Sequence, residues 1–282
     1  LLPAEICNTL ARWLDVPTEL TTAAVVMETA TEPYSTLKGS MRVYENLKRL
    51  WAGNYLYIVE RKQWVQWTDA GWQTLPPETP YTLAAETLKH YYTDGLLRTP
   101  TDADQFRLLT QSLNELGNAR NIQEGVRLLA GNPEFQSHKD EWDADPNILC
   151  APNGVIDLNT GELRPYTPDV RCFRRTRAQY HPDAEAPLWQ RFLHDIFGDP
   201  SLIDYIQKVF GAALYGRNRE QCLLLLWGYG ANGKSTLVNT IMYTLGDYAG
   251  VIPRDALLQR KQAQDAKRII YPALEGLRLG VL

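Results

Sequence analysis

The sequence contains few cysteines, few histidines and no long hydrophobic run. Its four cysteines include no C-x-x-C pair, and its four histidines supply no metal-ligand spacing. This pattern favours a reducing compartment and no structural zinc. The longest apolar run, residues 222–227, is far shorter than the roughly 20 residues of a membrane-spanning helix. We therefore expect a cytoplasmic protein that makes no contact with a membrane.

The composition is otherwise close to that of an average globular protein. Of 282 residues, 44% are hydrophobic and 22% charged, with 19 Gly and 17 Pro, which excludes a collagen, a coiled coil or wholesale disorder. The length predicts about two domains. The net charge is -4, with an acidic first half and a basic second half, so a polyanionic partner is favoured in the second half. The chain starts at Leu1, and we expect that the natural N-terminus lies before it.

The first half alternates between helical and strand-like patterns. Apolar residues recur with helical spacing over residues 3–14 and 40–51, separated by a connector at 21–33. From residue 54 to about 75 the period becomes two, and a turn at residues 69–71 indicates a small antiparallel meander. Helices are predicted after it, over residues 82–92, 103–117 and 122–129.

The second half opens with a β unit at about residues 147–178. Two short strands flank a hairpin turn expected at Asn153-Gly154, and Asp157 is favoured as a turn residue over a catalytic carboxylate. A helix is predicted over residues 187–197. Asp199 is the expected N-cap of the next helix, with Pro200 at its first position.

The sharpest motif is G-x-x-x-x-G-K-S at residues 228–235, the pattern of a phosphate-binding loop. Glycines let backbone N–H groups turn towards phosphate oxygens. Lys234 would then meet the β- and γ-phosphates, and the Ser235 hydroxyl would bind Mg²⁺. The predicted nucleotide cradle consists of Gly228, Tyr229, Gly230, Ala231, Asn232, Gly233, Lys234, Ser235 and Thr236.

The flanking sequence supports this interpretation of the loop. Residues 222–227 are predicted to form a buried strand of a parallel sheet that leads into the loop, and residues 236–245 a helix that ends at Gly246. A glycine-rich turn that binds nothing does not need a strand and a helix in this order. The motif and its surroundings together predict a nucleotide-binding site.

Several blocks in this order resemble the phage and plasmid primase-helicase family, to which poxvirus-type primase-helicases are related. The resemblance runs from about Tyr57 to the C-terminus. The blocks that carry it are Trp67 to Trp72, Asn153-Gly154-Val155-Ile156-Asp157-Leu158, Thr160-Gly161-Glu162-Leu163, Trp189 with Phe192-Leu193, Gly211, the phosphate-binding loop, and Leu245-Gly246-Asp247-Tyr248.

The resemblance implies a superfamily 3 DNA helicase with an α/β P-loop ATPase core of the AAA+ class. Such a protein uses ATP and Mg²⁺ and unwinds single-stranded or fork DNA as a homo-oligomeric ring, commonly a hexamer, often with a primase-polymerase domain upstream. The predicted domains are an accessory domain at 1–180, a helical collar at 181–216 and the start of the ATPase core at 217–282. The compartment would be the cytoplasm of the host cell.

The chain departs from the family pattern at its end. Residues 277–282 resemble the strand that leads to the Walker B acidic residues, but those acids do not follow within the sequence. The polar sensor, the DNA-contacting hairpin and the arginine finger are also absent. We therefore expect a core that is truncated at its C-terminus. The chain alone would bind nucleotide weakly and would not hydrolyse it.

Two further clusters allow both a functional and a structural interpretation. Arg171, Arg174, Arg175 and Arg177, in a strand-like stretch, could contact DNA phosphates, or could form a solvated face or an ion-pair surface between subunits. The aromatic residues of positions 51–72 could stack on unpaired bases, but packing within a small sheet is favoured.

Two other function classes compete with a helicase. A replication initiator or loader of the AAA+ class would bind DNA and ATP without unwinding, and strand displacement by the complete protein distinguishes the two. A small-molecule or nucleotide kinase would share the loop but would not need the preceding accessory structure.

Overall fold

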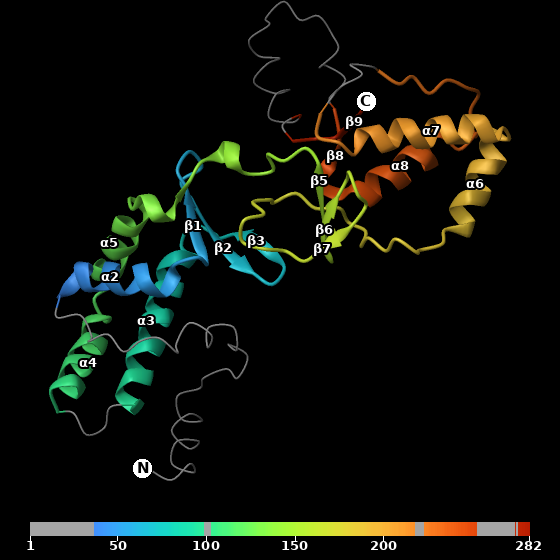
Figure 1. The fold of residues 1–282 in the computed structure, drawn as a ribbon. Coiled ribbons are helices and arrows are strands. Elements are labelled where there is room, and N and C mark those ends of the chain that lie inside the picture. The colour runs from blue at the N-terminus through green and yellow to red at the C-terminus, as the bar shows by residue number, and fades with distance from the viewer. Residues whose placement is uncertain (1–36, 99–102, 218–222, 253–273, 275) are drawn as a thin grey trace, which may run out of the picture. The chain divides into compact units, whose positions relative to one another are not determined.

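The computed structural model describes residues 37–98, 103–217, 223–252, 274 and 276–282 (Figure 1). The helix predicted at 3–14 and the connector at 21–33 lie outside these residues. The chain divides into two compact units, Leu1–Ala52 with Glu78–Gly131, and Gly53–Pro77 with Asn132–Leu282. Within the described residues, no helix is both long and apolar enough to span a bilayer.

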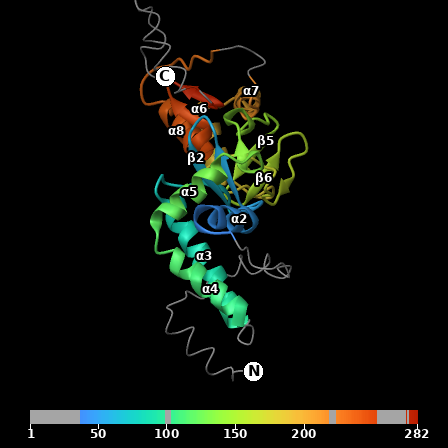
Figure 2. The ribbon, with the colours of Figure 1, turned by 90° about the vertical axis from the view of Figure 1, so that its left-hand side faces the viewer.

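Helices make up the secondary structure described for the first unit. They are α2 (Gly39–Trp51), α3 (Thr79–Arg98), α4 (Ala103–Glu115) and α5 (Ala119–Ala130). Helices α3 and α4 pack against each other, and so do α2 and α5 (Figure 2). A Cβ at Gly125 of α5 would overlap Val43 of α2, so glycine allows the two helices to approach closely. The four helices predicted within these residues are confirmed.

A four-stranded sheet opens the second unit. It contains β1 (Tyr55–Ile58), β2 (Gln63–Thr68), β3 (Gly71–Thr74) and β4 (Gln136–Ser137) in the order β3-β2-β1-β4. The first three strands form the predicted antiparallel meander, whereas β4 joins β1 in parallel and was not predicted. Two short 3₁₀ helices, η2 (Pro133–Phe135) and η3 (Lys139–Glu141), flank β4.

A three-stranded sheet follows, with β5 (Ile148–Ala151), β6 (Gly154–Asp157) and β7 (Leu163–Arg164). Because Ala151 pairs with Gly154, the hairpin turn is Pro152-Asn153, one residue before the predicted position. Gly154 was expected in the turn, but it lies on β6 and is required there by the neighbouring strand. A Cβ there would overlap the carbonyl oxygen of Arg164, so glycine permits the close approach of β7.

The rest of the second unit is mostly helical. It comprises α6 (Pro187–Phe197), α7 (Pro200–Ala213), α8 (Lys234–Leu245), the 3₁₀ helix η4 (Gly246–Tyr248), and the parallel pair β8 (Ala249–Val251) and β9 (Leu279–Val281). The predicted cap of α7 is confirmed, because the Asp199 side chain accepts a hydrogen bond from the Ser201 backbone N–H at 2.9 Å. Within residues 277–282, which were expected to form a strand, Leu279–Val281 does so.

The prediction of a strand immediately before the phosphate-binding loop is wrong for the described residues. Residues 223–227 form no strand, and the side chains of Leu223, Leu225 and Trp227 are 74%, 78% and 91% exposed. A buried strand needs neighbours that accept its backbone hydrogen bonds and cover its side chains. Among the described residues, β8 and β9 pair only with each other, so no described strand supplies hydrogen bonds to this segment. The P-loop ATPase fold thus stays a prediction.

The structure also corrects the interpretation of the cysteines. Cys150 of β5 and Cys172, 22 residues later, form a disulfide that is almost completely buried. Their spacing in the sequence did not reveal this pair, because an extended segment after β7 returns along β5. The spacing therefore does not support the inference of a reducing compartment.

Candidate nucleotide-binding site

The phosphate-binding loop leads directly into the N-terminus of α8. Gly233 caps the helix with a φ of 80°, and Ala231 also has a positive φ, of 57°. A non-glycine residue in this region of conformational space is uncommon and is often found at functional sites. A Cβ at Gly233 would lie 2.8 Å from the Ile196 side chain of α6, and one at Gly228 would overlap the Asn232 amide. The loop requires glycine at both ends of its motif.

The Lys234 ammonium group lies over this loop and contacts neutral oxygens. It donates hydrogen bonds to the carbonyl oxygens of Gly228 and Tyr229, both at 2.9 Å, and to the Asn232 side-chain oxygen at 2.7 Å. No ion pair joins it to a carboxylate of the described residues. Its positive charge is therefore not neutralised there, and it lies at a helix N-terminus that also favours an anion.

The remaining residues of the predicted cradle are accessible. Tyr229 is 94% exposed, and Gly230, Ala231, Asn232, Ser235 and Thr236 are also exposed. A Cβ at Gly230 would meet nothing within 4 Å, so this glycine is not required by close packing. The structure brings all nine predicted residues to the start of α8. A ligand could reach them from solvent.

Helix α8 is held in place by its apolar side. Leu237 and Leu245 are buried, and Leu237 and Ile241 line an apolar cavity of about 570 Å³ together with residues of α6 and α7. The side chains of Phe192 and Ile196 lie beneath Gly233. Helix α6 thus supports the loop directly.

The four predicted DNA-contacting arginines lie on an irregular extended segment, not a strand. We define residues 165–178 as the strap. Arg171 pairs with Glu141, Arg174 donates to the Asp247 carbonyl oxygen at 2.8 Å, and the guanidinium carbons of Arg175 and Arg177 lie 5.1 and 4.2 Å from the ring centres of Tyr166 and Tyr243. Each of these side chains contacts a neighbour within the second unit. Whether they also contact DNA stays a prediction.

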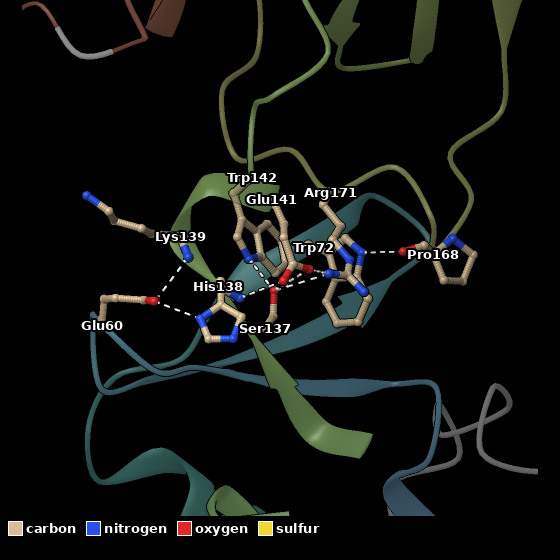
Figure 3. A network of polar contacts seen from close by, with 9 residues as sticks. All are labelled: Glu60, Trp72, Ser137, His138, Lys139, Glu141, Trp142, Pro168 and Arg171. Carbon is tan, nitrogen blue, oxygen red and sulfur yellow. Dashed lines mark hydrogen bonds and ion pairs between the residues drawn. The ribbon is translucent and has the colours of Figure 1, made fainter. Parts of the chain in front are cut away.

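The strap is bonded to the sheet that contains the meander (Figure 3). The buried Ser137 hydroxyl accepts hydrogen bonds from Trp142 at 2.8 Å and Arg171 at 3.3 Å, and donates to Glu141 at 3.3 Å. The Trp72 indole N–H donates to the Pro168 carbonyl oxygen at 2.9 Å. This network attaches the strap to the sheet and has a structural role, because its polar groups form hydrogen bonds with one another.

The strap is also bonded to η4, immediately after α8. The Arg175 N–H donates to the Asp247 carboxylate at 3.1 Å, and the Asp247 N–H donates to the Arg175 carbonyl oxygen at 3.0 Å. The Tyr248 hydroxyl accepts from the Cys150 N–H at 3.1 Å and donates to the Arg174 carbonyl oxygen at 3.0 Å. Burial raises the pKa of Tyr248 to about 12, so this hydroxyl keeps its proton. The strap therefore connects the four-stranded and the three-stranded sheet to the end of α8.

The aromatic cluster is explained by packing. Trp51, Tyr55, Trp64 and Trp72 are all buried, and Trp72 and Trp142 pack edge to face with ring centres 5.6 Å apart. The interpretation as packing within the sheet is confirmed for Tyr55, Trp64 and Trp72, whereas Trp51 is buried on α2. The turn role of Asp157 is also confirmed, because its carboxylate accepts from the Asn159 N–H at 2.9 Å.

Sequence reasoning missed two residues that organise the second unit, Asp143 at the strap and Arg278 at β5 and the end of α7. Asp143 has a positive φ of 55°, and its carboxylate accepts hydrogen bonds from the N–H groups of Phe173 and Arg174 at 3.0 and 3.1 Å. Arg278 donates to carbonyl oxygens of Leu214 and Ile148. Both act across long sequence separations and lie in no recognisable motif, so no local signal could have identified them.

The family model described as "D5 N terminal like" matches residues 45–198, more than half of the chain. The chain belongs to this family. A protein of Acanthamoeba polyphaga mimivirus, named "Putative helicase L207/L206", is 34% identical over 123 residues, which are 42% of this chain and 12% of that protein. The chain thus spans only a small part of the length of this relative. Together these findings support a relation to primase-helicase proteins.

Proposed function

We propose that this chain binds ATP with Mg²⁺ at the phosphate-binding loop and belongs to a DNA helicase of superfamily 3 type. In this proposal the loop and α8 start an α/β ATPase core of the AAA+ class, and the preceding residues form its collar and accessory domain. The protein would work in the replication of a phage or mobile element. It would act as a homo-oligomeric ring, most commonly a hexamer, on single-stranded or fork DNA.

One observation carries the nucleotide part of the proposal, namely the contacts that the Lys234 ammonium makes. Three neutral oxygens hold it over the loop, so it could exchange these contacts for the charged oxygens of a phosphate. The residues present fit such a ligand, because the loop is exposed and its ammonium is held only by neutral oxygens. The family match ends at residue 198, before the loop, so the support here is geometric.

The roles of the individual residues follow from their chemistry. Lys234 would neutralise the β- and γ-phosphates, and the exposed Ser235 hydroxyl in the first turn of α8 would bind Mg²⁺. Bound Mg²⁺ would neutralise charge that develops on the phosphates during hydrolysis. The backbone N–H groups at the start of α8 would complete the phosphate site.

The test is nucleotide affinity of the Lys234→Ala variant, measured with a fluorescent ATP analogue. Loss of one or two charge-assisted contacts costs about 2 to 4 kcal/mol, which weakens binding by roughly 30-fold to 1000-fold. The matched control is Lys208→Ala, which removes an exposed ammonium that pairs with Asp204 on α7. Unchanged affinity in a folded Lys234→Ala protein would show that the loop is not the nucleotide site.

The DNA part of the proposal has its own test. If phosphates dominate binding, affinity for single-stranded DNA falls steeply with salt and varies little with base sequence. Arg177 is the most exposed of the strap arginines. Arg177→Gln should therefore reduce the dependence of log affinity on log salt concentration by about the amount of one phosphate contact. Affinity that does not change with salt would remove the support for DNA binding through phosphates.

A further inference from the structure

The disulfide between Cys150 and Cys172 joins two segments with different roles. Cys150 belongs to β5, and Cys172 lies on the strap. Their side chains are 0% and 3% exposed and pack with Val155 in a small buried cluster. We propose that this pair is a reversible redox site that tightens the attachment of the strap to β5.

The two segments stay together without the disulfide, which is why the bond can be reversible. The Thr176 N–H donates to the Cys150 carbonyl oxygen at 2.8 Å, and the Tyr166 hydroxyl donates to the Ala151 carbonyl oxygen at 2.7 Å. These hydrogen bonds lie on both sides of Cys172 along the strap. Reduction therefore leaves the two sulfurs as neighbours, ready to be oxidised again.

A cavity lies beside the pair. Both cysteines line this cavity of about 630 Å³, together with Val155, Arg164 and Val170. Its volume is comparable to that of ordinary small-molecule sites, but the two side chains are almost completely buried, so a low-molecular-weight thiol or disulfide reaches the sulfurs when the strap opens locally from β5. The oxidant is a small-molecule disulfide. Two thiols and one such disulfide give the Cys150–Cys172 bond and two small thiols, with both protons transferred to the leaving thiols.

The bond fixes the strap to β5 at one point, where the two Cα atoms are 7.2 Å apart. The Cys150 N–H also donates to the Tyr248 hydroxyl, which donates to Arg174 of the strap. The redox state of one pair thus acts at the point where β5, the strap and the end of α8 meet.

The experiment measures thiol oxidation in the whole chain. The reduced protein is equilibrated with oxidised glutathione, quenched with acid, unfolded, alkylated, digested without reduction and analysed by mass spectrometry. We expect a linked peptide that contains Cys150 and Cys172, and its loss when dithiothreitol is added to the folded protein. Cys7→Ser and Cys222→Ser are matched controls that keep the link, whereas Cys150→Ser and Cys172→Ser abolish it.

The melting temperature gives a second, independent result. Closing a loop of this length should raise the melting temperature of the oxidised protein by roughly 5 to 10 °C over the reduced protein. This difference should vanish in Cys150→Ser. Free, alkylated Cys150 and Cys172 after oxidation, or a link to another cysteine, would overturn the proposal. So would a bond that dithiothreitol cannot reduce in the folded protein. None of these readouts requires nucleotide or DNA.

Discussion

The phosphate-binding loop and the strap differ in how their positive charges are satisfied. Lys234 contacts three neutral oxygens of its own loop, whereas Arg171 pairs with Glu141, and Arg175 and Arg177 lie over aromatic rings. Sequence reasoning selected the loop from its glycine and lysine motif, and it left the arginines open between DNA contacts and a solvated or ion-pair surface. The comparison teaches that a charged motif is a better candidate site when the surrounding chain does not neutralise it.

The two regions also differ in what a mutation should affect. The strap contributes hydrogen bonds to the four-stranded sheet, the three-stranded sheet and η4, so its loss should lower the stability of the second unit. The loop is exposed and makes few contacts outside itself and α6. Changes there should affect ligand binding and leave stability nearly unchanged.

The largest effect on the strap is expected for Asp143→Ala. This change removes the acceptor of two backbone N–H groups and places alanine at a φ of 55°, so we expect a loss of about 2 to 4 kcal/mol in the free energy of unfolding. The matched variant is Asp143→Asn, which keeps an oxygen acceptor and tolerates the positive φ. Denaturant unfolding checks both, and equal losses in the two variants would contradict this role.

A smaller effect is expected for Tyr248→Phe. The ring remains, but the buried Cys150 N–H and the Arg174 carbonyl oxygen lose their partner, which costs about 1 to 3 kcal/mol. Tyr243→Phe is the control, because its side chain is 61% exposed and the ring beneath Arg177 is preserved. If thermal unfolding shows the same stability for both variants, the hydroxyl does not tie the strap to η4.

The smallest effect concerns pH and the Glu60–His138 contact near the strap network (Figure 3). Hydrogen bonds from the His138 ring and from backbone N–H groups, including that of Lys139, lower the pKa of Glu60 from 4.5 to about 2. A lowered carboxyl pKa stabilises the fold above the unfolded value, and this stabilisation is lost as the pH falls from about 4.5 towards 2.

The Glu60→Gln variant measures this contribution. Its deficit in unfolding free energy relative to the parent should be present at pH 6 and shrink on acidification through the window between about 4.5 and 2. The control is Glu162→Gln, which removes an exposed carboxylate and leaves the Glu60–His138 contact intact. A deficit that stays constant over this range would show that the hydrogen bond does not stabilise the folded state.

Local sequence signals predicted the elements well. Short-range periodicity and capping predict the helices of the first unit, the meander, the Asp199 cap and the helix after the loop. The strand before the loop failed, because an apolar run becomes a buried strand only where neighbouring strands cover it. The turn predicted at Asn153-Gly154 lies one residue earlier, because Gly154 is required by its contact with Arg164 of β7, ten residues later along the chain.

The candidate site could be predicted only in part. The loop is contiguous in the sequence, so its motif alone is enough to identify Lys234 and its neighbours. The strap depends on contacts that join distant residues, such as Asp143 with Arg174 and Cys150 with Tyr248. No spacing rule encodes such pairs.

The central claim is tested most directly by comparing Lys234→Ala with Arg175→Ala for both nucleotide affinity and melting temperature. Lys234→Ala should lower ATP affinity by roughly 30-fold to 1000-fold and leave the melting temperature nearly unchanged. Arg175→Ala should keep the affinity and lower the melting temperature by about 2 to 4 °C, because it loses its contact with Tyr166. Equal loss of affinity in the two variants, or none in Lys234→Ala, would contradict the account.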